Sequence, residues 1–174
     1  MEASSGRPGY ELWRPNREKS EAKATKALVS LVLLISAALV LLITLGGWER
    51  LQSSGAGTIG VLWGVLYIVF AFLVAKWNRG VLAIAAALGI LMAIFAAVAT
   101  PTWFARAKDG LSSPALPEEL LGLLTLLLVP VQIIMIIVCL YAFNQNWQVE
   151  EERPIGGGTE YPDADASEGA AATA

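Results

Sequence analysis

The side chains with the most distinctive chemistry lie near the middles of long apolar stretches. Ser36, Tyr67 and Gln132 fall at nearly the same depth in three such stretches. A hydroxyl or amide without a partner is costly in an apolar surrounding, so we predict that these three side chains form a small hydrogen-bonded cluster between helices. The same residues also suit the midplane binding site of a small carrier or channel. The structural role is favoured, and the transport role stays open.

Pro130 lies two residues before Gln132, inside the same apolar stretch. Proline has no backbone N–H, so the carbonyl of Leu126 loses its helical partner. We therefore predict a kink in this helix at Pro130. The freed carbonyl beside Gln132 is a second polar group at the same depth.

The composition excludes several kinds of chemistry that small membrane proteins perform. The chain has no histidine and one cysteine, Cys139, and none of its apolar stretches contains a carboxylate. Haem ligation by histidine, dithiol exchange, histidine-assisted nucleophilic catalysis and proton coupling through a buried carboxylate are thereby removed. We expect no catalytic residues, no cofactor and no metal site, and we expect that the protein is not an enzyme.

Four uncharged runs must position these residues. They cover residues 27–45, 59–75, 81–99 and 120–143, in a chain of 174 residues that is 56% hydrophobic and 16% charged. A helix needs roughly 17–25 apolar residues to cross a membrane, and each run meets that length. The sequence predicts an all-α integral membrane protein, namely a four-transmembrane-helix bundle over residues 27–143.

Polar segments flank the predicted bundle on both sides. Residues 1–26 form a polar N-terminal segment, of which 16–26 could extend the first helix, and residues 144–174 form an acidic tail. Both segments lack a hydrophobic pattern, so we expect them to be disordered. The first apolar run is too long, and too far from the N-terminus, for a typical signal peptide.

Basic residues predict the orientation. An even number of spans puts nine Lys and Arg on the side of the two tails and three, Arg50, Arg106 and Lys108, on the other side. Cytoplasmic segments carry the excess of basic residues, so we expect both termini in the cytoplasm and the protein in the plasma membrane. Four tryptophans just outside the runs are expected to anchor the helix ends at the headgroups: Trp48, Trp77, Trp103 and Trp147.

Small residues predict where the helices touch. Helices in lipid associate through close packing at small side chains, and each run has such a stripe. The residues we expect at helix interfaces are Gly60, Gly64, Ala71, Gly89, Ala93, Thr125 and Cys139. Close packing within the chain is favoured over dimer formation for the GxxxG motif that Gly60 and Gly64 form.

These observations favour a non-enzymatic accessory, scaffold or assembly protein that acts through helix–helix contacts and cytoplasmic tails. Its expected partners are the lipid bilayer and other membrane proteins or further copies of itself. A net charge of −3 does not favour nucleic acid as a partner. The alternative is a small oligomeric channel or transporter that uses Tyr67 and Gln132, and a membrane enzyme ranks last. No motif is specific enough to assign a family.

Overall fold

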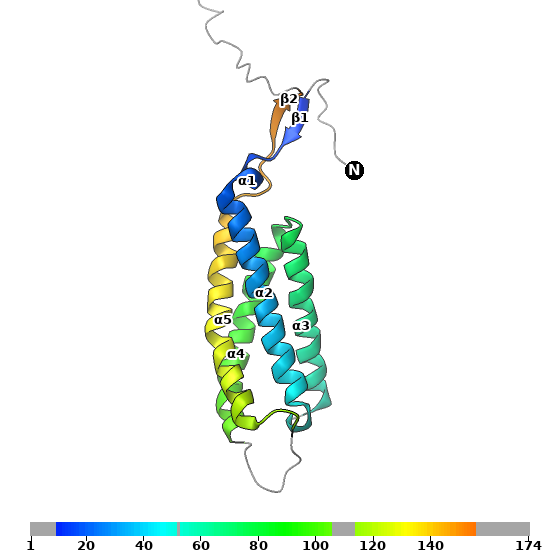
Figure 1. Ribbon diagram of the computed structural model, residues 1–174, viewed down its shortest axis with the longest axis vertical. Coiled ribbons are helices and arrows are strands. Elements are labelled where there is room, and N and C mark those ends of the chain that lie inside the picture. Colours follow the sequence, from blue (N-terminus) through cyan, green and yellow to red (C-terminus); the bar gives the residue numbers. More distant parts are fainter. Residues whose placement is uncertain (1–9, 52, 106–113, 156–174) are drawn as a thin grey trace, which may run out of the picture. The chain divides into compact units, whose positions relative to one another are not determined.

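Four long helices make up most of the computed structural model, which describes residues 10–51, 53–105 and 114–155. They are α2 (Ser20–Gly46), α3 (Ser54–Ala75), α4 (Gly80–Phe104) and α5 (Glu118–Asn144), and Figure 1 shows them running alongside one another. All four are long and apolar enough to cross a membrane. The four predicted helices are therefore present, at the predicted places in the chain.

The helices pack as two antiparallel pairs. α2 lies along α3, α4 lies along α5, and the pairs meet where α2 contacts α5. α3 and α4 contact each other over only a short stretch, although a tight turn joins them. We call the end where α2 begins and α5 ends the tail end, and the end with the α2–α3 connection the loop end.

Each helix is longer than its uncharged run, because polar residues cap or extend it. α2 begins seven residues before the first run, and Ser53 caps α3 by accepting a hydrogen bond from the N–H of Ala56. α4 continues through Pro101, which the sequence pattern had placed in the connection to the next run. At the loop end, the short helix η1 (Trp48–Arg50) follows α2, and Arg50 pairs with Glu118 at 2.8 Å.

The segments outside the bundle differ in part from the predicted disorder. β1 (Tyr10–Trp13) pairs antiparallel with β2 (Glu151–Pro154), and the helical turn α1 (Pro15–Glu18) follows β1. An ion pair between Arg14 and Glu150 and a cation–π contact of Arg153 with Trp13 support the pairing. An isolated two-stranded sheet is only marginally stable, and these cross-strand contacts stabilise it. The hydrophobic pattern of the sequence did not reveal them. Residues 1–9 and 156–174 lie outside the described part of the chain.

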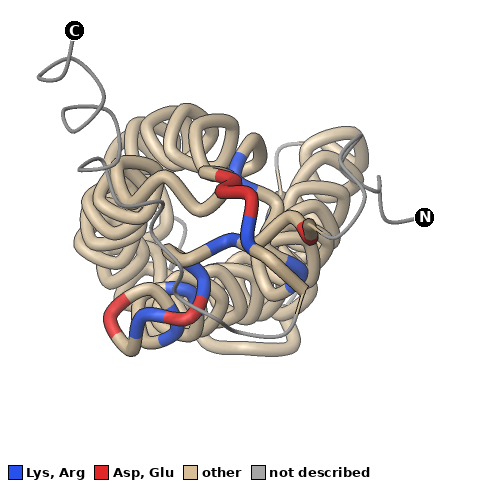
Figure 2. The backbone as a smooth tube through the Cα atoms, turned by 90° about the horizontal axis from the view of Figure 1, so that it is seen from above, with Lys and Arg blue, Asp and Glu red and all other residues tan. Residues whose placement is uncertain are grey.

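The outer surface of the bundle is apolar. Large side chains such as Leu62, Phe72, Ile94 and Ile137 are more than half exposed, and the visible charged residues in Figure 2 lie at helix ends and in the terminal segments. Such a surface fits lipid rather than water. The interior combines small residues with large side chains such as Tyr67, Leu33 and Met135, and it holds a few buried polar side chains.

Candidate functional site

A hydrogen bond crosses the centre of the bundle between Tyr67 on α3 and Gln132 on α5. The Tyr67 hydroxyl donates to Gln132 Oε1 at 2.9 Å, and both side chains are fully buried. α3 and α5 belong to different helix pairs, so this bond links the two pairs through the middle of the bundle. The structure thus brings together two of the three residues that the sequence placed in a cluster.

Ser36 is also fully buried, but it bonds elsewhere. Its hydroxyl lies 3.8 Å from the sulfur of Met135, one turn along α5 from Gln132. The amide nitrogen of Gln132 meets no hydrogen-bond acceptor among the described residues. The cluster is therefore a pair with a separate neighbour, and it leaves both N–H donors of the Gln132 side chain unused. Pro130 lies within α5, and the kink remains a prediction.

Glycines let α3 approach α2. A Cβ added to Gly64 would lie 2.6 Å from Leu41 Cγ, and one added to Gly60 would collide with Thr44. Ala71 is buried further along the same face, where Ser30 donates to its carbonyl at 3.3 Å. The small-residue stripe of α3 therefore lies against α2, within the chain.

The α4–α5 contact uses the other predicted small residues. A Cβ on Gly89 would lie 2.6 Å from Met135 Cε, and Ala93, one turn further along α4, is half-buried. Thr125 and Cys139 are buried on α5, and Thr125 donates to the carbonyl of Leu121 at 2.7 Å. Cys139 is a free, fully buried thiol.

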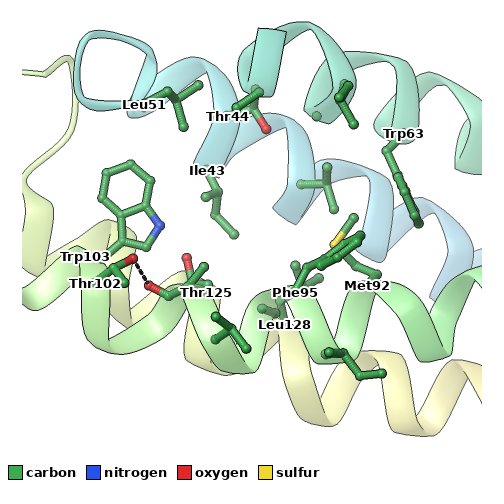
Figure 3. A pocket seen from close by; sticks show the side chains of 18 residues that line it. Ile43, Thr44, Leu51, Trp63, Met92, Phe95, Thr102, Trp103, Thr125 and Leu128 are labelled. Carbon is green, nitrogen blue, oxygen red and sulfur yellow. Dashed lines mark hydrogen bonds between the residues drawn. The ribbon is translucent and has the colours of Figure 1, made fainter. Parts of the chain in front are cut away.

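A cleft lies between α3 and α4 in the half of the bundle near the loop end. Its cavity volume is about 650 Å³. Figure 3 shows it lined by side chains of all four helices, with Ile43 and Thr44 from α2, Trp63 from α3 and Leu128 from α5. It forms where α3, packed on α2 by its glycines, diverges from α4.

Aromatic residues border the cleft. Trp63 meets Phe95 edge to face, with ring centroids 6.0 Å apart, at the end nearer the middle of the helices. Trp103 and Leu51 lie at the end nearer the loop end. Both ends are thus lined by large apolar surfaces.

The lining is uncharged and nearly all apolar. Its hydroxyls belong to Thr44, Thr102 and Thr125, and the last two donate to backbone carbonyls of their own helices. The indole N–H of Trp63 has no acceptor among the described residues. The cleft can hold a hydrocarbon group.

The four tryptophans lie at the bundle ends, but they do not all face outward. Trp48 is 40% exposed and Trp77 is partly exposed, whereas Trp103 and Trp147 are 3% and 0% exposed. For the last two, the prediction of a ring facing lipid headgroups does not agree with the structure. Trp103 packs near Gly47 at the end of α2, and Trp147 packs against Trp77.

Nothing in the described residues resembles a metal centre: no three or more Cys, Asp or Glu side chains gather there to hold an ion. The site predicted from sequence holds a hydrogen bond between α3 and α5, and the cleft lies nearer the loop end. The sequence did not predict this cleft, because the cleft depends on how far α3 and α4 diverge. The large aromatic residues Trp63 and Phe95, which lie inside apolar runs, were the signal in the sequence that could have pointed to it.

Comparison of the chain with protein-family profiles, with curated proteins and with solved structures finds no match.

Proposed function

We propose that this chain is a non-enzymatic accessory protein of the plasma membrane, with both termini in the cytoplasm, and that it binds a lipid hydrocarbon chain in the α3–α4 cleft. The observation that carries the proposal is the uncharged cleft of about 650 Å³ where α3 and α4 diverge. Small-molecule pockets span about 300–1,000 Å³. An apolar guest would enter sideways from the bilayer.

The length of the cleft along α4 favours a lipid chain as its guest. Its α4 lining runs from Met92 to Trp103, which is about 17 Å at a rise of about 1.5 Å per residue. A hydrocarbon core is about 30 Å thick, so the cleft spans about one leaflet. The Trp63–Phe95 pair borders it at the midplane, where a lipid chain ends.

The extent of the cleft argues against a partner helix as the guest. The cleft runs about 17 Å along α4, about one leaflet, whereas a partner helix would continue past the midplane into the other leaflet. The outer faces of the helices and the tails remain available for protein partners, as an accessory role requires.

Filling the cleft tests the proposal. Ala99 lines the cleft, whereas Ala97 on the same helix is exposed on the outer surface. We expect the parent protein, extracted in mild detergent, to retain one lipid in native mass spectrometry. Ala99→Phe should lose it, and the matched control Ala97→Phe should retain it.

Two results would contradict this function. Equal lipid retention by the parent and Ala99→Phe would show that the cleft is not the site. Loss of a co-purifying protein, instead of a lipid, from Ala99→Phe would show that the guest is a protein segment.

The unused amide nitrogen of Gln132 favours one alternative, a small channel or transporter with its polar site at Tyr67 and Gln132. A transported molecule would then accept a hydrogen bond from this nitrogen. Flux into liposomes that is equal for wild type and Gln132→Leu would remove that alternative.

A further inference from the structure

We infer that the tail end of the bundle carries a binding site for the phosphate of an anionic lipid headgroup, built from Lys26, Arg79 and the Trp77 ring. This site is independent of the α3–α4 cleft, which lies in the other half of the bundle. The inference rests on a strained backbone, on cations held against aromatic rings and on the charge of the surrounding residues.

Trp77 has a backbone conformation that tryptophan rarely adopts. Its φ is 65°, in the left-handed region. It ends α3 with two backbone bonds, from Trp77 N–H to the Val74 carbonyl at 2.8 Å and from Asn78 N–H to the Leu73 carbonyl at 3.0 Å. Glycine usually occupies this position in such a helix end, so the large ring is kept there despite the strain.

The ring of Trp77 positions cations. Lys26 Nζ lies 4.3 Å from its centroid, the Arg17 guanidinium lies 5.7 Å from it, and Trp147 meets it edge to face at 5.2 Å. Trp147 is fully buried, so it fixes the Trp77 ring against the bundle. The ring therefore collects positive charge from two separate elements, α1 and α2.

Arg79, immediately before α4, adds a second cation at the tail end of the bundle. Its guanidinium lies 4.1 Å from the Phe143 ring centroid, and Nε donates to the Phe143 carbonyl at 2.8 Å. Lys26 Nζ lies 3.4 Å from the carbonyl of Ala75. Within the part of the chain that the structure describes, neither Lys26 nor Arg79 forms an ion pair with a carboxylate. The remaining N–H groups of both are free to bind oxygen atoms of a phosphate.

The surrounding charge fits an anion at a membrane surface. Lys76, next to Trp77, lies over the Phe72 ring and adds a third cation, and the nearest acidic residues in sequence, Glu18 and Glu21, precede Lys26 on α1 and α2. Basic side chains at this level attract anionic headgroups. The aromatic rings place these cations at the border of the apolar surface, where lipid phosphates lie.

The test measures retention of phosphatidylglycerol, phosphatidylcholine or inorganic phosphate by the full chain in native mass spectrometry. Lys26→Gln should lower phosphatidylglycerol retention about fivefold relative to the parent. The matched control is Lys23→Gln, one turn earlier on α2 with an exposed side chain, and it should change retention less than twofold.

A second variant separates a built site from general charge. Trp77→Asn keeps every cation, and asparagine tolerates the left-handed backbone, so the turn that ends α3 is preserved. We expect it to weaken phosphatidylglycerol retention as Lys26→Gln does. Equal effects of Lys23→Gln and Lys26→Gln, or no effect of Trp77→Asn, would overturn the site. Equal retention of phosphatidylcholine would overturn its specificity for anionic lipid, and binding of inorganic phosphate alone would overturn the lipid as its source.

Discussion

At the scale of single residues, the bond between Tyr67 and Gln132 shows why polar groups persist in an apolar bundle. Both side chains are fully buried, and their oxygen atoms are 2.9 Å apart. A bond of this kind contributes about 1 kcal/mol in a membrane, but an unpaired partner in the same place is costly. Losing one partner should therefore be worse than losing both.

We predict that Tyr67→Phe lowers the free energy of unfolding by about 1 kcal/mol, because it leaves the Gln132 carbonyl oxygen without a donor. The double variant Tyr67→Phe with Gln132→Leu should recover part of this loss. Thermal or denaturant unfolding in detergent measures both changes. A Tyr67→Phe protein as stable as the parent would show that the bond does not stabilise the fold.

Residue types and their depth could predict that Tyr67 and Gln132 form a pair, but not that Ser36 lies outside it. Depth in the apolar runs placed Ser36, Tyr67 and Gln132 together, and two of them do bond. Ser36 contacts Met135 instead. Depth along the helix did not predict this contact, because depth does not reveal how α2 is rotated about its axis. The burial of Trp103 and Trp147 was also not predictable, because it depends on how the helix ends pack against their neighbours.

At the scale of helices, the glycines of α3 determine how closely it packs against α2. Gly60 and Gly64 admit Thr44 and Leu41 of α2, so the backbones of α2 and α3 come close. The spacing of these glycines predicted a small-residue face. It could not predict which helix meets that face, because every run has a similar stripe.

We predict that Gly64→Ala lowers stability by about 1–3 kcal/mol, because the new methyl group would overlap the branched end of Leu41. The matched control is Gly55→Ala on the same helix, whose Cβ would have Ser53 Oγ as its nearest atom at 3.6 Å. That control should stay within about 0.5 kcal/mol of the parent. Unfolding in detergent compares the two, and a Gly64→Ala variant that equals its control would contradict the close packing of α2 and α3.

At the scale of the whole molecule, the sequence predicted the number and the approximate extent of the helices, because uncharged runs of this length have few other uses. The tight turn before α4 and the proline-rich connection before α5 also separated the last three helices. The pairing of β1 with β2 was not predictable, because it joins segments from opposite ends of the chain.

We predict that both tails lie on the cytoplasmic side and that the loop end faces outward. In a Cys139→Ala background, Glu49→Cys in η1 should react with a membrane-impermeant maleimide on intact cells. Glu151→Cys in β2 should react only after the cells are opened. Labelling of both variants on intact cells, or of neither, would contradict this topology.

The hydrogen bond between Tyr67 on α3 and Gln132 on α5 couples the width of the α3–α4 cleft to the packing at the centre of the bundle. The two hairpins, α2 with α3 and α4 with α5, can move apart at the cleft without disturbing the packing inside either one. Such a movement would stretch the contact between Tyr67 and Gln132, which joins the two hairpins. A bulky guest between Trp63 and Thr102 would thus leave the Tyr67 hydroxyl and the Gln132 amide without hydrogen-bond partners in an apolar interior. The free-energy cost of these unpaired groups would limit the size of the guest that the protein accepts.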